Sequence, residues 1–346
     1  MSRTDRSDDA VEPPHPRETN AWFGHAAAER ALVDAYRGGR IAHAWLIGGP
    51  PGIGKATLAY RMARFVLAHP DPSARVVEGA TTLAVGPAHP VARRIAARAH
   101  ADLLVLERTE GESGALRTVI TVEEVRRTVS FFGRTAGEGG WRVCIVDAAD
   151  ELQYPQGSNA LLKVLEEPPP RALFLLVSHA PGRLLATIRS RCRPLAMRPL
   201  AAEDVARAAA AALGRSEDDA EVAAAASAAD GSVGRAVMLL GGAALKLRER
   251  VGELLAALPS VDPMALHALG DALGRADPQT FATFVDTVRD WLSARLARGA
   301  GEPARLAQMA QVWEKLNRAA REVEVFNLDR KPMVFAVFGL LAETAR

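Results

Sequence analysis

The residues with the clearest chemical potential lie in the glycine-rich stretch GGPPGIGKATLA, residues 48–59. Gly49, Gly54 and Lys55 fit the pattern G-x-x-x-x-G-K-[ST], in which backbone N–H groups surround phosphate oxygens and the lysine reaches the β- and γ-phosphates. The alternative is an ordinary Gly-Pro turn that opens a helix. We expect a nucleotide-binding loop made of Gly49, Pro50, Pro51, Gly52, Ile53, Gly54, Lys55, Ala56 and Thr57.

Two positions whose side chains normally take part in ATP hydrolysis carry alanine in this sequence. Ala56 stands where a serine or threonine hydroxyl completes the magnesium shell, and Thr57 points about 100° further round the helix. Asp147 ends the apolar run VCIVD at the position expected for the acidic residue on the magnesium side. Ala148 follows it, where an active ATPase would carry a glutamate that polarises water. We expect the chain to bind ATP or ADP and to have little or no ATPase activity of its own.

Other polar residues near these motifs allow two interpretations each. The apolar run ALFLLVS ends at Ser178 and His179, where a polar side chain either senses a γ-phosphate or, for Ser178, is a satisfied strand-end hydroxyl. Asp150 and Glu151 are better placed to cap or decorate the next helix than to replace the missing catalytic groups. Arg191, in SRC, carries a permanent forked charge that suits a phosphoryl group. From the residues alone, a salt bridge within its own domain is the simpler interpretation of Arg191.

The elements that must position these residues form an α/β pattern. Four apolar runs read as buried strands and alternate with helical segments: HAWLIGG, ADLLVLER, WRVCIVDAAD and ALFLLVSHA. Apolar strands that alternate with helices predict a parallel sheet covered on both faces. The loop at residues 49–57 then joins the first strand to the helix after it.

The rest of the pattern divides the chain into four parts. Residues 1–20 are polar, charged and contain prolines, which predicts a flexible tail. Residues 21–199 form the nucleotide-binding domain, and the alanine-rich residues 200–243 form a small helical lid domain. Residues 244–346 carry apolar side chains at helical spacing, which predicts an all-helical domain.

Composition bounds the possible functions. The 346 residues include 43 Lys and Arg against 41 Asp and Glu, a net charge of +2, so any contact with DNA must be local. With only two cysteines we expect no disulfide framework, and a four-cysteine zinc site is excluded. His69, His89 and His100, between the two nucleotide motifs, do not make a zinc site without thiolates. The sequence has no signal-peptide pattern and no apolar run of membrane-spanning length, so we expect a cytoplasmic protein without a membrane partner.

The motifs HAWLIGGPPGIGKATLA, ALLKVLEEPP and TIRSRC together resemble the AAA+ subunits of DNA clamp loaders. The blank catalytic positions resemble the delta-prime subunits of bacterial DNA polymerase III within that family. The resemblance covers about residues 14–200, and GSVGRAV and the helical C-terminal third are compatible with it. It implies an AAA+ P-loop parallel-sheet domain, a helical lid domain and an all-helical collar domain.

The resemblance also implies a function. The chain would be a non-motor subunit in the ATP-dependent loading of a sliding clamp onto primed DNA, within a DNA-directed DNA polymerase holoenzyme, a nucleotidyltransferase. Arg191 would act as an arginine finger in trans, in the ATP site of a neighbouring subunit. The partners would be the motor subunits and the delta subunit, with the sliding clamp and primer-template DNA reached through the assembled complex. Many relatives carry a four-cysteine zinc module that this sequence lacks, so no zinc is expected.

Two alternatives with a different function stay open, and a third keeps the same role with no nucleotide bound at the loop. The first is an ATP-hydrolysing motor subunit of the gamma/tau kind, in which Thr57 and Asp150 or Glu151 cover the missing groups. The second is another P-loop protein, such as a small-molecule kinase, which would not need the helical C-terminal third. Motor subunits present a sensing arginine from the lid domain, but Gly234 occupies that position here and Arg235 follows it.

Overall fold

The structure is a computed structural model that describes residues 14–111, 116–133, 140–241, 243–276, 278–298, 303–326 and 328–344. The chain divides into two compact units, Met1–Val237 and Met238–Arg346. The first unit contains the sheet and every motif singled out above. The four-part division of the sequence stays a prediction.

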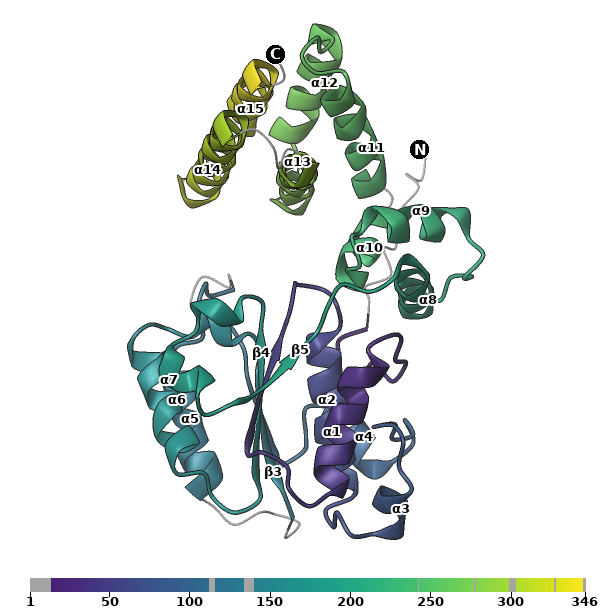
Figure 1. Cartoon of the computed structure of the whole chain (residues 1–346), viewed down its shortest axis with the longest axis vertical. Coiled ribbons are helices and arrows are strands. Elements are labelled where there is room, and N and C mark those ends of the chain that lie inside the picture. Colours follow the sequence, from purple (N-terminus) through teal and green to yellow (C-terminus); the bar gives the residue numbers. More distant parts are fainter. Residues whose placement is uncertain are drawn as a thin grey trace, which may run out of the picture. The chain divides into compact units, whose positions relative to one another are not determined.

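The first unit is built on five parallel strands in the order β2-β3-β4-β1-β5 (Figure 1). Their bounds are β1 (Ala44–Gly48), β2 (Leu103–Leu106), β3 (Arg142–Val146), β4 (Ala172–Ser178) and β5 (Arg193–Ala196). β1 and β4 are buried along their whole length, because helices cover both faces of the sheet. The predicted α/β architecture and four of its strands are confirmed. β5 is a fifth strand that the sequence pattern does not predict, because its side chains are mostly exposed and form no apolar run.

Helices pack on the two faces of the sheet in two groups, visible on either side of it in Figure 1. One group consists of α1 (Ala26–Arg37), α2 (Lys55–Ala68), α3 (Arg75–Glu78) and α4 (Pro90–Ala96). The other consists of α5 (Val122–Gly133), α6 (Gln156–Glu166) and α7 (Ala186–Arg189), with the 3₁₀ turns η1 (Ala149–Glu151) and η2 (Pro181–Arg183) joining strands to helices. Along β1, Trp45 and Ile47 enter the core under the first group, and Leu46 enters the core under the second. Because successive residues of a strand point to opposite sides, the position of a residue along β1 decides which of the two cores it enters.

Part of the segment predicted to be a flexible tail, residues 14–20, is tied to α2. Arg61 donates to the backbone oxygen of Asn20 at 2.7 Å, and Arg64 donates to the backbone oxygen of Thr19 at 2.6 Å. Both arginines are buried and need acceptors, and Glu29 pairs with Arg61 at 2.6 Å. The tail prediction therefore needs correction for these residues, because composition alone does not reveal buried donors elsewhere in the chain.

Helices alone follow β5 in the described residues. The first unit continues with α8 (Ala202–Leu213) and α9 (Ala220–Ala228), and its boundary falls within α10 (Val233–Leu239). The second unit contains α11 (Ala243–Ala256), α12 (Pro263–Gly274), α13 (Pro278–Arg298), α14 (Pro303–Phe326) and α15 (Arg330–Thr344). Phe281, Phe284 and Phe338 lie in its core. None of the helices in the described part of the chain is long and apolar enough to span a bilayer.

Candidate functional site

The glycine-rich loop joins β1 to α2, with backbone geometry that few residues other than glycine adopt. Gly52 has φ 73°, and a Cβ placed on it would lie 2.2 Å from the Oγ of Ser232. α2 begins at Lys55, and Gly54 before it gives the helix no side-chain cap. The first N–H groups of α2 therefore have no side-chain partner at Gly54, and the positive end of the helix dipole favours an anion there.

Lys55 is buried and held against its own loop. Its Nζ donates to the backbone oxygen of Gly49 at 2.7 Å and also to that of Pro50. Burial lowers the pKa of Lys55 to about 8, and the nearby carboxylates of Asp147 and Asp150 oppose that shift. A phosphate group on the loop would give the ammonium an anionic partner in place of neutral carbonyls.

A cavity of about 670 Å³ opens at the loop. Its walls include residues 52–57 of the loop, Trp22 and Phe23 before α1, Ala208 of α8 and Val233 of α10. This volume lies within the range of about 300–1,000 Å³ that small-molecule sites occupy. Aromatic and aliphatic walls with a cation and free N–H groups at one end suit a base and a phosphate chain respectively.

The structure brings seven of the eleven predicted nucleotide-binding residues to this cavity: Gly52, Ile53, Gly54, Lys55, Ala56, Thr57 and Asp147. Gly49, Pro50, Pro51 and Ser178 are not among its lining residues. Trp22 and Phe23 also line the cavity, and their only signal in the sequence is an aromatic pair directly after a polar stretch. Of the two polar residues at the end of β4, His179 lines the cavity and Ser178 does not.

Asp147, at the carboxyl end of β3, lies at the cavity as expected. Burial raises the pKa of its carboxyl to about 6, and Glu151 and Glu107 add to the rise. Lys55 opposes this shift. The carboxyl of Asp147 is therefore mostly charged at neutral pH. Keeping this charge buried costs free energy of folding, and a bound cation would reduce that cost.

Asp150 organises the end of β4. It accepts hydrogen bonds from the Oγ of Ser178 at 2.8 Å, from the backbone N–H of Ala180 at 3.3 Å and from the backbone N–H of His179. Ser178 is fully buried, and this bond satisfies its hydroxyl locally. Burial and the charge on Lys55 lower the pKa of His179. The sequence favoured a role for Asp150 at the next helix, but these bonds tie it to the end of β4 instead.

The start of α10 and the residue before it contact the backbone of the glycine-rich loop. The N–H of Gly234 donates to the backbone oxygen of Gly52 at 3.0 Å, and Ser232 donates to that of Pro51 at 3.1 Å. Arg235 pairs with Asp230 at 3.1 Å. Gly234 makes this contact through its backbone N–H, so an arginine side chain at position 234 would not strengthen it.

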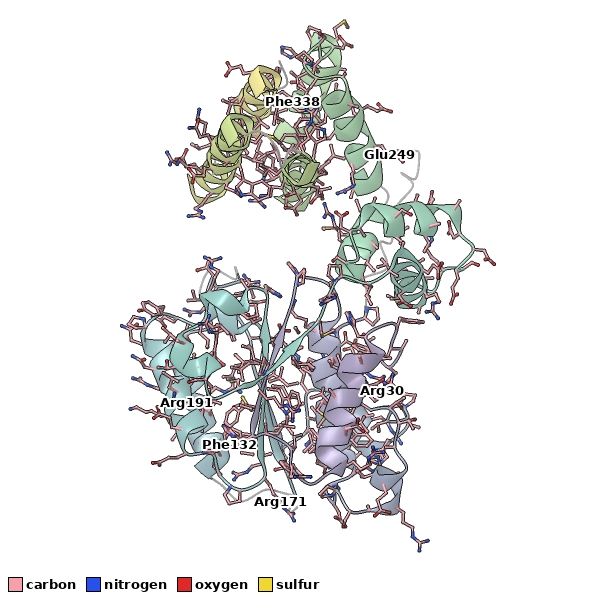
Figure 2. The ribbon with its side chains drawn as sticks, viewed as in Figure 1. Arg30, Phe132, Arg171, Arg191, Glu249 and Phe338 are labelled. Atoms are coloured by element: carbon pink, nitrogen blue, oxygen red, sulfur yellow. The ribbon has the colours of Figure 1, made fainter. Side chains whose placement is uncertain are left out.

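Arg191 lies on the opposite face of the sheet from Lys55. Its neighbour Cys192 is buried in the core under α5, α6 and α7, where burial raises the pKa of the thiol to about 11. Arg191 pairs with Glu166 at 2.7 Å and donates to the backbone oxygen of Thr187 at 2.8 Å. Figure 2 shows Arg191 beside α6 and α7, across the sheet from Arg30 of α1. The side chain of Arg191 is 34% exposed, so solvent still reaches it beside these contacts.

The histidines between the two nucleotide motifs do not gather around one point. His69 and His89 have ring centroids 6.3 Å apart, and His89 caps α4. In the described part of the chain, no three His, Cys, Asp or Glu side chains are grouped to hold a metal ion.

The sequence profile of the family described as DNA polymerase III, delta subunit, matches residues 24–201, just over half of the chain. The chain is 40% identical over 157 residues to DNA polymerase III subunit delta' of Pseudomonas aeruginosa, covering 45% of this chain and 43% of that protein. It is 34% identical over 166 residues to the subunit of the same name in Escherichia coli, covering 47% and 44%. It is 33% identical over 165 residues to DNA polymerase III subunit gamma/tau of Mycobacterium bovis, covering 46% and 25%.

The chain thus spans less than half the length of the relatives that it matches. The matched part contains the parallel sheet, the glycine-rich loop and the SRC turn. The predicted α/β fold with a helical C-terminal region is confirmed, and so is the resemblance to delta-prime subunits. The chain belongs to the DNA polymerase III delta subunit family, and its relatives include proteins named delta'.

Proposed function

We propose that the chain is the non-motor delta-prime subunit of a replicative clamp loader, which takes part in ATP-dependent loading of a sliding clamp onto primed DNA. In this role it binds ATP or ADP without efficient hydrolysis and supplies Arg191 to the ATP site of a neighbouring subunit. One observation carries the proposal: a phosphate-binding loop without its magnesium hydroxyl lies on one face of the sheet, and Arg191 lies on the other.

The residues that stand at the catalytic positions, and the partners of nearby carboxylates, support weak or absent ATP hydrolysis by this chain. Ala56 provides no hydroxyl for magnesium, and Ala148 provides no carboxylate for the attacking water. Both carboxylates that could replace them have other partners. Asp150 holds the end of β4, and Glu151 pairs with Arg108 at 2.9 Å. Recruiting either group to catalysis would break an existing interaction.

The chemistry of Arg191 suits a site completed by two subunits. A guanidinium is permanently charged and forked, so it stabilises the charge that spreads over a transferring phosphoryl group. Arg191 and its own Lys55 lie on opposite faces of the sheet. The ATP that Arg191 serves therefore belongs to a neighbour in the ring.

The proposed partners follow from the names of the relatives, which include DNA polymerase III subunits delta' and gamma/tau. They are the gamma/tau motor subunits and the delta subunit, with the sliding clamp and primer-template DNA bound by the whole assembly. The helical second unit contributes to a collar between subunits. The chain works in the cytoplasm, as part of a DNA-directed DNA polymerase holoenzyme.

The test is reconstitution with the motor and delta subunits of the same organism, comparing native chain with Arg191→Ala. Arg189→Ala is the matched control, because Arg189 lies two residues away and contacts only the backbone of η2 in the described residues. Arg191→Ala is expected to assemble normally and to lose one site's share of the ATP turnover that clamp and DNA stimulate. Unchanged turnover would remove the arginine-finger role.

The gamma/tau relatives favour one second candidate, a motor subunit that hydrolyses ATP itself. Such a chain, purified alone, would show magnesium-dependent ATPase activity that Lys55→Ala abolishes. The proposal above predicts binding of labelled ATP or ADP to the purified chain, without turnover above background.

A further inference from the structure

The guanidinium of Arg191 is held at a defined place on the surface. One nitrogen, Nη2, pairs with Oε1 of Glu166 at 2.7 Å. The other, Nη1, donates to the backbone oxygen of Thr187 at 2.8 Å and lies 3.5 Å from the Oγ of Ser190. We infer that Glu166 is a positioning residue for Arg191, which sets the place and direction of the guanidinium before a neighbouring subunit binds. This inference rests on the proposed function of Arg191.

The ion pair is too exposed to be explained by the stability of the fold. The side chains of Arg191 and Glu166 are 34% and 49% exposed, and pairs with such exposure add little to folding stability. The pair does restrict rotation of the Arg191 side chain. This matters because a free arginine side chain has many rotamers, and most of them are lost when it enters a site. Holding Arg191 in advance removes part of that loss from the step at which the subunits meet.

Both members of the pair stand on rigid supports. Glu166 is the last residue of α6, which ends there because Pro168 disfavours helical geometry in the residue before it. Its neighbour Leu165 and the neighbour of Arg191, Cys192, are both buried in the core under α5, α6 and α7. The carbonyl end of α6 also carries partial negative charge, which adds to the attraction for the guanidinium.

The contacts leave donors for a ligand. A guanidinium has five N–H groups, and Thr187, Ser190 and Glu166 account for three. In the part of the chain that the structure describes, the Nε–H and the second N–H of Nη2 have no partner. Two donors are what bidentate contact with phosphate oxygens requires. Glu166 therefore holds Arg191 without blocking it.

The experiment uses the reconstituted clamp loader and compares Glu166→Ala with Glu167→Ala. Glu167 is the next residue, is also exposed, and forms no ion pair in the described residues, so it controls for loss of one surface charge. Arg191→Ala defines the share of stimulated ATP turnover that the arginine supports. Glu166→Ala is expected to remove more than half of that share, as about a fivefold slowing of one site, through kcat with KM for ATP unchanged. Glu167→Ala is expected to match the native chain.

A double variant separates positioning from a structural role. In the Arg191→Ala background, Glu166→Ala is expected to cause no further loss of turnover, and both chains are expected to unfold at the native temperature. A further loss in that background would overturn the inference, because Glu166 would then act independently of Arg191. A rise in turnover of the single variant would also overturn it, because Glu166 would then restrain the arginine.

The outcomes also distinguish this inference from the proposal beneath it. If Arg191→Ala lowers turnover and Glu166→Ala matches Glu167→Ala, the arginine acts in trans but Glu166 does not position it. If Arg191→Ala itself has no effect, the proposed function fails, and the role of Glu166 fails with it.

Discussion

Asp147 gives a prediction whose size and sign come directly from the structure. Its carboxyl has a pKa of about 6 in the folded chain, against an ordinary value of 3.8. Each unit of difference corresponds to about 1.4 kcal/mol, so the charged carboxylate costs the fold up to about 3 kcal/mol. Asp147→Asn removes the charge and keeps nearly the same shape. The variant is therefore expected to be more stable than the native chain at pH 7, by at most about 3 kcal/mol.

The pH dependence of this gain has a defined sign. Between about pH 4 and pH 6 the folded chain binds more protons at Asp147 than the unfolded chain does, so native stability from this group falls as pH rises. The gain from Asp147→Asn is accordingly close to zero at pH 4, grows up to pH 6 and stays constant above it. Urea-dependent hydrogen exchange of the peptide that contains β3 measures unfolding of this unit alone. A gain that is absent, or equal at every pH, would refute the reasoning.

Three other substitutions test the loop and its surroundings. Lys55→Ala is expected to weaken binding of labelled ADP at pH 7 by about tenfold or more. The native affinity is expected to fall between pH 7 and pH 9 as Lys55 loses its proton, a fall that the variant lacks; calorimetry measures both. Arg61→Ala leaves Glu29 buried without its cation and is expected to cost about 3–5 kcal/mol in urea unfolding, whereas a cost below about 1 kcal/mol would contradict a tight buried pair. Gly52→Ala adds strain at φ 73° and a clash with Ser232, so thermal unfolding should show a loss of at least about 1–2 kcal/mol, of which Ser232→Ala restores only the part due to the clash.

Much of the fold could be predicted because it depends on local pattern. Four strands are continuous apolar runs, and the loop motif fixes where β1 ends and α2 begins. β5 could not be found in this way, because its hydrogen bonds to β1 define it as a strand while its side chains stay mostly exposed. Its pairing is a long-range property that no window of sequence contains.

The candidate site was predictable where a motif fixes a residue's neighbours, and not where distant segments meet. Lys55 and Asp147 lie at the cavity as their motifs indicate. Trp22 reaches it because Arg61 and Arg64 of α2 hold the preceding residues, a contact across more than 40 positions of sequence. The sequence is equally consistent with a phosphate sensor and with a satisfied hydroxyl at Ser178, and only the structure reveals that Asp150 accepts its hydrogen bond.

The central claim is that Arg191 reaches ATP held by another subunit, and a proximity measurement tests it most directly. Both native cysteines are buried, so a thiol placed on the surface can be labelled selectively. In complexes assembled with Arg191→Cys, a thiol-reactive ATP analogue bound to the motor subunits is expected to label this chain at position 191. Arg189→Cys is expected to remain unlabelled. Absence of label at position 191, or equal labelling of Arg191→Cys without the motor subunits, would contradict the account.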